Sequence, residues 1–85
     1  MLVLRLKALA DDTRIGIIRF LFKGKKTVSE ITASTGKSQP NASLALKQLM
    51  MANLIFQEKK GKFIYYGLKN KEDLREIFKI LEKNK

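Results

Sequence analysis

The 85-residue sequence contains no cysteine and no histidine. Without cysteine the chain can form neither a disulfide framework nor a thiolate metal site, and cysteine-based redox sensing is excluded. Without histidine it also lacks the commonest general base and the commonest nitrogen ligand of transition metals. The sequence offers no paired carboxylates or glycine-rich phosphate loop in their place. We therefore expect a protein that is not an enzyme and that binds no metal or other cofactor.

Long apolar runs are absent as well. The longest, residues 15–22, is interrupted by Arg19 and is much shorter than the ~20 residues of a membrane span. The first residues also lack the charged start, apolar middle and small-residue cleavage site of a secretory signal. We therefore expect no membrane partner and a cytoplasmic location.

The composition suits one small folded domain. Apolar residues make up 45% of the chain and charged residues 31%, which is too apolar for a disordered tail. A chain of this length buries only about 60–65% of the surface that its unfolded form exposes, so it has room for a single core. We assign residues 1–85 to one domain.

Acidic residues are scarce, and their distribution is uneven. Lysine and arginine total 18 against 8 acidic residues, a net charge of +10. Ten basic and two acidic residues lie within 23–71, whereas residues 72–85 contain four of each. A polycationic middle favours a polyanionic partner such as nucleic acid, and the simpler alternative is a solvated surface.

Apolar spacing predicts two helices in the first part of the chain. Leu2, Leu6 and Leu9 recur at helical spacing, which predicts an amphipathic helix over residues 1–10. Asp11 or Asp12 can cap a second helix, and the apolar residues of that helix cover most of its circumference. Such a helix is typical of the centre of a small bundle.

A capping box and a second cap predict two further helices. Thr27-Val28-Ser29-Glu30 predicts a short helix that stops at Gly36. Ser38 can cap the next helix, with Pro40 in its first turn. We expect the buried side of that helix to consist of Ala42, Leu46, Leu49 and Met50.

A hairpin and a last helix complete the pattern. Residues 54–56 and 63–66 are β-prone runs on either side of a lysine-rich turn that contains Gly61. Asn70 can cap a final helix whose apolar stripe, Leu74, Ile77, Phe78 and Leu81, has no obvious partner. Helix, tight turn and helix over 28–52, followed by a hairpin over 54–68, predict a winged helix-turn-helix. The expected fold is mainly α, with five helices and a two-stranded wing.

Several stretches carry a family resemblance that runs through nearly the whole chain. They are residues 6–14 (LKALADDTR), 15–21 (IGIIRFL), 38–43 (SQPNAS), 46–49 (LKQL), 52–55 (ANLI) and 60–68 (KGKFIYYGL). In order and spacing they resemble the opening motif, following helix, recognition helix and wing of the ArsR/SmtB family of prokaryotic repressors. The resemblance implies a cytoplasmic homodimer that binds a palindromic operator and represses transcription.

The resemblance also implies that the first and last helices, residues 1–10 and 71–83, contact the partner subunit. The expected interface residues are Leu2, Leu6, Leu74, Ile77, Phe78 and Leu81. The alternative is that both stripes pack onto the core of their own chain, because a small domain needs all the burial available to it.

DNA contacts follow from the resemblance, position by position. Gln39 and Ser43 stand where the family touches base edges, and glutamine can form a bidentate pair with adenine. Pro40 and Leu44 stand at neighbouring positions, where Leu44 contacts a thymine methyl or belongs to the core. Ser38 and Asn41 contact phosphates or cap the helix, and for Ser38 the cap is favoured. The lysines expected at phosphates, or serving only solubility, are Lys37, Lys47, Lys59, Lys60 and Lys62.

The sequence departs from the metal-sensing members of that family. Thr27-Val28-Ser29 stands where those members commonly hold Cys-Val-Cys, and the last helix offers carboxylates without histidine. The sequence therefore predicts no soft-metal site and identifies no effector. Two other functions stay open: an architectural or weakly specific DNA-binding protein, and a winged-helix module that binds proteins. The polar start of the predicted recognition helix favours a specific regulator.

Overall fold

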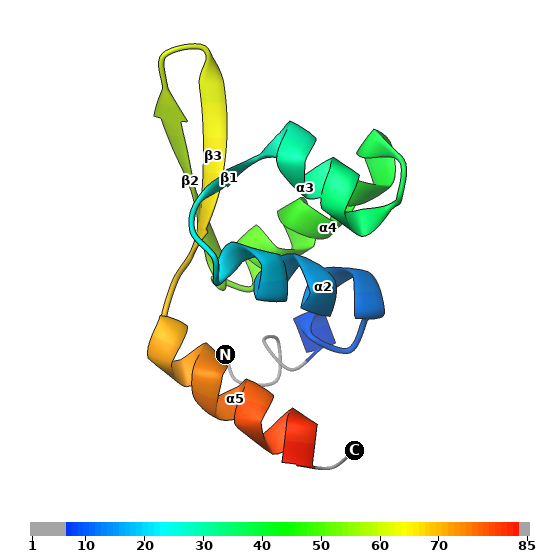
Figure 1. Ribbon diagram of the computed structural model, residues 1–85, viewed down its shortest axis with the longest axis vertical. Helices are drawn as coiled ribbons and strands as arrows, with labels where there is room; N and C mark the ends of the chain where they lie inside the picture. Colours follow the sequence, from blue (N-terminus) through cyan, green and yellow to red (C-terminus); the bar gives the residue numbers. More distant parts are fainter. Residues whose placement is uncertain (1–6, 84–85) are drawn as a thin grey trace.

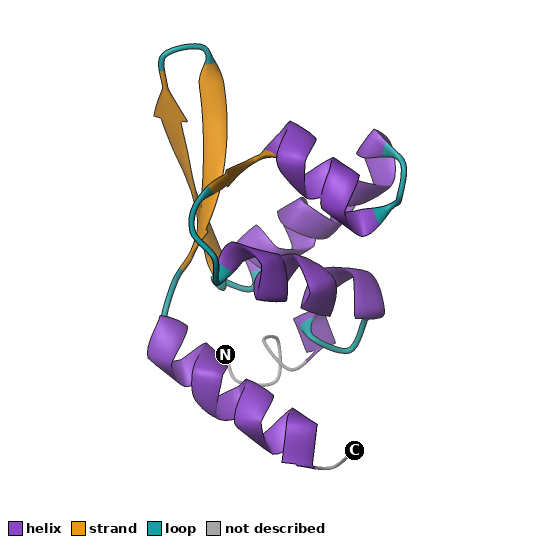
Figure 2. Ribbon diagram, viewed as in Figure 1, coloured by secondary structure: helices purple, strands orange, loops and turns teal. Residues whose placement is uncertain are grey.

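The computed structural model describes residues 7–83. A hairpin projects from one end of a group of helices, and the last helix lies at the opposite end (Figures 1 and 2). In chain order the elements are α2 (Asp12–Leu21), β1 (Lys26–Thr27), α3 (Val28–Thr35), α4 (Gln39–Met51), β2 (Ile55–Lys60), β3 (Phe63–Leu68) and α5 (Lys71–Lys83).

The predicted winged helix-turn-helix is present, but the predicted number of helices differs. The described residues form four helices instead of five. Most of the helix expected over residues 1–10 lies outside the described residues, and only Lys7 and Ala8 at its end are helical. The expected interface residues Leu2 and Leu6 also lie outside them.

Side-chain caps begin the first three of these helices, as the sequence predicts. The Asp11 carboxylate accepts a hydrogen bond from the Arg14 amide at 3.0 Å. The Thr27 hydroxyl accepts one from the Glu30 amide at 3.2 Å, and the Glu30 carboxylate accepts one from the Thr27 amide at 2.9 Å. The Thr27 hydroxyl also donates to the Glu30 carboxylate at 3.1 Å. The bonds that the Thr27 amide and hydroxyl donate to this carboxylate hold the pKa of Glu30 below its ordinary value, the backbone bond most strongly. The Ser38 hydroxyl accepts from the Asn41 amide at 3.3 Å and caps α4.

The sheet has three strands where the sequence predicts two. β3 lies in the middle, with β2 antiparallel on one side and β1 antiparallel on the other. Lys26 and Thr27 of β1 pair with Tyr66 and Tyr65. A strand of two residues carries no alternating apolar pattern, so sequence reasoning could not detect it. This short strand joins the wing to the start of α3.

The core surrounds α2. Ile17, Ile18 and Leu21 of this helix are almost fully enclosed by buried residues of the other elements, among them Ile31, Leu46, Leu49, Leu54, Ile55, Leu68, Leu74 and Phe78. Within α4 the prediction of a buried side is confirmed for Ala42, Leu46 and Leu49 but is wrong for Met50, which is 37% exposed. Ala45 is buried instead, because it lies between Ala42 and Leu49 on the helical surface.

The stripe on α5 has a partner within its own chain. Leu74 is fully buried and Phe78 nearly so. The Phe78 ring packs edge-on against Phe22, just after α2, with 5.8 Å between ring centroids. Arg19 of α2 forms an ion pair with Glu82 at 3.0 Å. Leu74 and Phe78 therefore pack in the core of their own chain, because a domain this small needs the burial that this stripe offers. Their place in a dimer interface stays a prediction.

Leu74→Ala should lower the free energy of unfolding by about 2–5 kcal/mol, since it leaves a cavity in a closed core. Urea denaturation at one fixed protein concentration measures the change. Leu81→Ala is the matched control, because Leu81 is on the same helix and 38% exposed. A loss for Leu74→Ala no greater than that of the control would contradict the burial of Leu74.

Candidate nucleic-acid interface

The helix-turn-helix consists of α3, a turn at residues 36–38 and α4. Gly36 ends α3 with a φ of 68°, a left-handed conformation that glycine adopts at little cost. The Ser38 cap then fixes the start of α4. With the buried side of α4 held against the core, its other side faces solvent over the whole length of the helix.

The predicted base- and phosphate-contacting residues of α4 come together on that exposed side. All are exposed: Gln39, Pro40, Asn41, Ser43, Leu44 and Lys47. Lys37 and Ser38, in the turn before α4, are exposed too. The helix contains no acidic residue. The surface thus combines amide, hydroxyl, apolar and cationic groups with no carboxylate among them.

The exposure of Leu44 excludes one of the two roles that the sequence leaves open for this residue. Its side chain is 55% exposed, so the interpretation of Leu44 as a core residue is wrong. Its contact with a thymine methyl stays a prediction.

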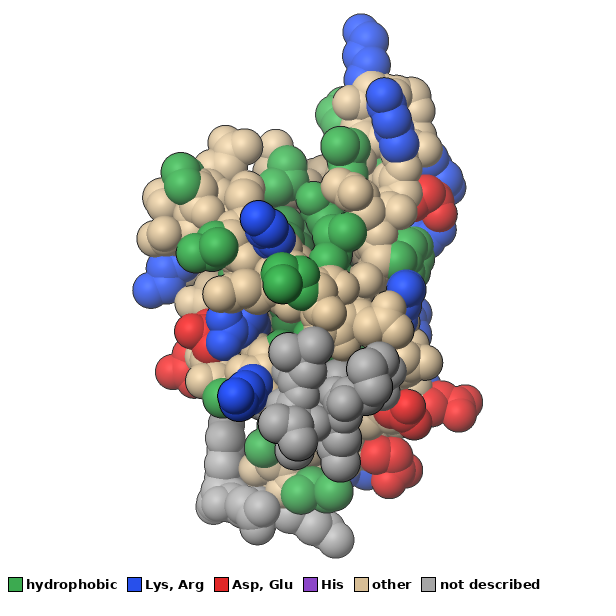
Figure 3. All heavy atoms as spheres, turned by 180° about the vertical axis from the view of Figure 1, so that it is seen from behind, with side chains coloured by type: hydrophobic (Ala, Val, Ile, Leu, Met, Phe, Trp, Pro, Cys, Tyr) green, Lys and Arg blue, Asp and Glu red, His purple; other side chains and the backbone are tan. Residues whose placement is uncertain are grey.

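The wing presents the second group of predicted residues. Gly61 has a φ of 59° at the first position of the two-residue connection between β2 and β3, as in a type II′ turn. Lys59, Lys60 and Lys62 surround this turn and are exposed. Figure 3 shows basic side chains projecting from the tip of the wing, and a group of acidic side chains in the half of the molecule away from that tip.

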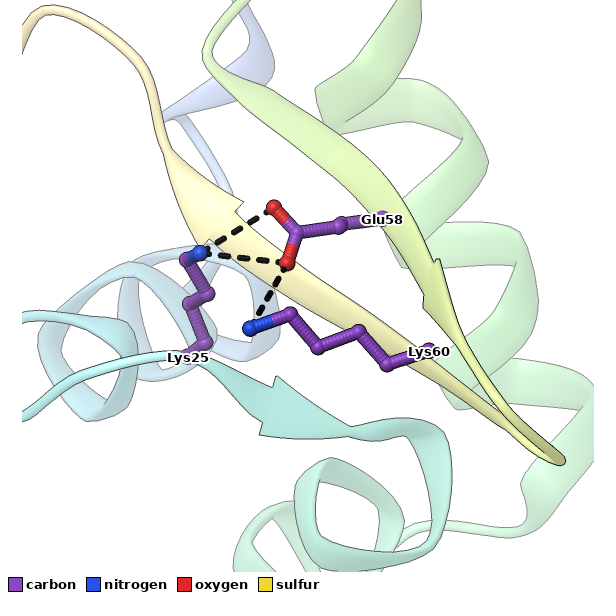
Figure 4. Close-up of polar contacts among 3 residues, drawn as sticks. All are labelled: Lys25, Glu58 and Lys60. Carbon is purple, nitrogen blue, oxygen red and sulfur yellow. Dashed lines mark hydrogen bonds and ion pairs between the residues drawn. The ribbon is translucent and has the colours of Figure 1, made fainter.

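One carboxylate on the wing interrupts this positive surface. The Glu58 carboxylate of β2 forms ion pairs with the ammonium groups of Lys25, at 3.1 Å, and Lys60, at 3.3 Å (Figure 4). The hydrogen bonds from Lys25 and then Lys60 hold the pKa of Glu58 below its ordinary value. The Lys25 ammonium also lies 5.8 Å from the centre of the Phe56 ring. The ion pair between Glu58 and Lys25 therefore links the wing to the segment before β1. The Glu58 carboxylate also neutralises part of the positive charge of Lys25 and Lys60.

Arg14 is a residue that sequence reasoning did not select. Its guanidinium donates to the carbonyl of Ala8 at 2.6 Å, to the carbonyl of Lys7 at 3.4 Å and to the side-chain oxygen of Gln48. The same residue donates its amide to Asp11 at the start of α2. One side chain thus joins the end of the N-terminal segment to α4. No sequence signal reveals this, because Gln48 lies 34 positions further along the chain.

The remaining candidate chemistry is limited. Among residues 7–83, no group of three or more metal-ligating side chains comes together. No helix in this described part is long and apolar enough to span a bilayer.

A double-mutant cycle between Arg14 and Gln48 tests their contact. Arg14→Ala should lower the free energy of unfolding by about 1–3 kcal/mol, because the guanidinium bonds to two carbonyls as well as to Gln48. Gln48→Ala should cost less, and the coupling between the two changes should be about 0.5–1.5 kcal/mol. Strictly additive losses in urea denaturation would show that the two side chains do not interact.

Comparisons with known proteins agree with the geometry. The profile of the arsR family of bacterial regulatory proteins matches residues 11–56. The chain is 41% identical over 69 residues to the arsenical resistance operon repressor of Bacillus subtilis, covering 80% of this chain and 66% of that protein. It is 39% identical over 62 residues to the transcriptional repressor SdpR of the same organism, covering 73% and 69%. The chain spans about half the length of several other curated relatives.

A solved structure extends the likeness to the fold. It is the homodimeric winged helix-turn-helix DNA-binding domain of a possible ArsR-family transcriptional regulator from Mycobacterium bovis. The TM-score is 0.83 at 28% sequence identity, over 95% of this chain and 74% of that one. With the matched profile, the capped helix-turn-helix and the basic wing in agreement, the chain belongs to the ArsR family, a family of DNA-binding transcriptional regulators and not of enzymes.

Proposed function

We propose that this chain acts as a homodimeric, sequence-specific repressor that binds a palindromic operator. The observation that carries the proposal is the exposed, carboxylate-free side of α4, which adjoins a wing tipped with lysines. In helix-turn-helix proteins the second helix enters the major groove with its N-terminal residues toward the base edges. A basic hairpin beside it suits the neighbouring phosphates.

The residues divide into two roles. Gln39 and Ser43, in the first turns of α4, read base edges by hydrogen bonding. The exposed lysines neutralise phosphates and give affinity that depends on salt: Lys37, Lys47, Lys59, Lys60 and Lys62. Asn41 serves a phosphate or a base. The Ser38 hydroxyl is engaged in the helix cap, so its part is to fix the start of α4.

The dimer contact falls on a narrower part of α5 than the sequence suggests. Leu74 and Phe78 are buried in their own core, and Ile77 is half-buried against it. Ile80 and Leu81 remain exposed at 59% and 38%. We assign the dimer contact to this exposed end of α5 together with the N-terminal segment. A two-fold dimer places its recognition helices about 34 Å apart, one turn of DNA, which matches a palindrome.

We propose no soft-metal effector for this chain. The names of some relatives refer to arsenic or mercury resistance, but this sequence contains neither cysteine nor histidine. The softer ligands that select such ions are therefore missing.

Fluorescence anisotropy tests the proposal directly. The purified protein is titrated against the DNA upstream of its own coding sequence and against a scrambled duplex, each across a salt series. A preference of about 1000-fold or more for the upstream DNA would support a specific, self-regulating repressor. Equal and steeply salt-dependent binding would favour an architectural protein or a distant operator. No binding at low salt would favour a protein-interaction module.

The wing lysines should act through phosphates. Replacing Lys59, Lys60 and Lys62 by alanine should weaken binding to every duplex and flatten the salt dependence by about one unit per lost phosphate contact. A slope equal to that of the wild type would remove the wing from the interface.

Glu58→Gln should have the opposite effect. The substitution removes the carboxylate that pairs with Lys25 and Lys60, so both ammonium groups become available to phosphates. Affinity for any duplex should therefore rise, and the salt dependence should steepen by up to about one unit. The control is Glu82→Gln, which removes the same charge from an ion pair on α5. Equal effects of the two substitutions in the anisotropy titration would show that only net charge matters.

Ile80→Asp should convert the dimer to monomers, as measured by light scattering, because it places a charge in the proposed apolar contact. Phe63→Asp is the matched control, since Phe63 is equally exposed at 59% but lies on the wing. A dimer that persists with Ile80→Asp would move the interface away from this end of α5.

A further inference from the structure

Leu44 is the largest apolar side chain in the first half of α4, and it points away from the core. It is 55% exposed, between Pro40 one turn before it and Lys47 one turn after it. A groove beside it is lined by Asn41 and Gln48 of the same helix, by Lys37 of the turn, and across from them by Asp11, Thr13 and Arg14 at the start of α2. An exposed leucine on this helix therefore lies beside amide groups and lysines, and the one carboxylate of the groove, Asp11, caps α2.

The groups on this face have a definite preference among base pairs. In the major groove adenine presents an acceptor and a donor that suit an amide side chain, whereas thymine presents a methyl group that suits an apolar one. Guanine is most often read by arginine or lysine. α4 contains no arginine, and its one lysine, Lys47, lies beyond the N-terminal residues that face the base edges. Among the described arginines, Arg14 is occupied by Ala8 and Gln48, Arg19 pairs with Glu82, and Arg75 lies near Phe22.

We propose that Leu44 determines sequence specificity by contacting the 5-methyl group of a thymine, and that the centre of each half-site consists of A·T pairs. Gln39 or Asn41 reads the adenine edge beside it. This inference rests on the proposed function, because it names the bases that the same surface recognises.

The charge of the surroundings favours DNA over a protein as the occupant of this face. Lys37 and Lys47 flank Leu44, and the wing adds its lysines. No carboxylate lies on α4, and Asp11 across the groove is the one acidic side chain that lines it. A major groove that contains thymine offers phosphates for the lysines and a methyl group for the leucine.

The experiment begins with a library of random 30-base-pair duplexes, from which the wild-type protein selects its preferred sites. Each thymine of the selected duplex is then replaced by uracil, which removes only the methyl group and keeps every hydrogen-bonding group of the pair. Affinities are measured for the wild type, for Leu44→Ala and for Met51→Ala. Met51 provides the control because it is exposed on the last turn of the same helix.

We expect selected half-sites with A·T pairs at their centre. Uracil at one thymine position of a half-site should weaken wild-type binding about fourfold, the value of one buried methyl group. Leu44→Ala should bind thymine and uracil duplexes equally, whereas Met51→Ala should keep the fourfold difference. Leu44 is exposed, so its replacement should leave folding intact, which circular dichroism checks.

Other results overturn the inference in distinct ways. Selected half-sites with G·C centres, or equal wild-type binding to thymine and uracil duplexes, would refute methyl reading while leaving a specific repressor intact. Loss of the methyl effect in Met51→Ala but not in Leu44→Ala would assign the contact to Met51. A library that yields no preferred sequence would refute the proposed function itself and this inference with it.

Discussion

The enclosure of α2 is the constraint on which the rest of this structure depends. Ile17, Ile18 and Leu21 are almost without exposed surface, and the buried side chains of α3, α4, α5 and the sheet pack around them. Each of these elements must turn its apolar side inward to complete one small core. The outer side of α4 and the tip of the wing are left to face solvent, so the candidate DNA surface is a consequence of how the core closes.

Two groups of polar contacts lie beside this surface, whose position is already set by the packing of the core. Arg14 joins Gln48 on α4 to two carbonyls at the end of the N-terminal segment, and Glu58 gathers Lys25 and Lys60 at the wing. The first contact links the proposed reading helix to a segment assigned to dimerisation. The second lowers the free positive charge of the wing. The pairs Arg14–Gln48 and Lys25–Glu58 each connect elements that are far apart in the sequence.

The chemistry of α4 defines the proposed reading surface. The helix presents amides, a serine, one lysine and an exposed leucine, with neither arginine nor any acidic residue. Such a face suits A·T pairs, because amide groups match the adenine edge and the leucine matches the thymine methyl. The sequence also contains neither cysteine nor histidine, and the proposal of no soft-metal effector rests on this.

Local signals in the sequence determined much of the fold. The caps at Asp11, Thr27 and Ser38, the turn at Gly36 and the hairpin around Gly61 each depend on neighbouring residues, so their positions could be read directly. The buried side of α4 followed from helical periodicity, except that Met50, predicted to be buried, is exposed and Ala45 is buried instead. The family resemblance then supplied their proposed roles.

Only the tertiary structure decided which apolar stripe meets which. The sequence shows that Leu74 and Phe78 belong to an amphipathic face, but the same pattern serves a core or a dimer, and the packing of Phe78 on Phe22 places it in the core. The third strand and the contacts of Arg14 and Glu58 are equally invisible in the sequence. Periodicity and capping act over a few residues, whereas these contacts depend on the distances that folding sets between remote parts of the chain.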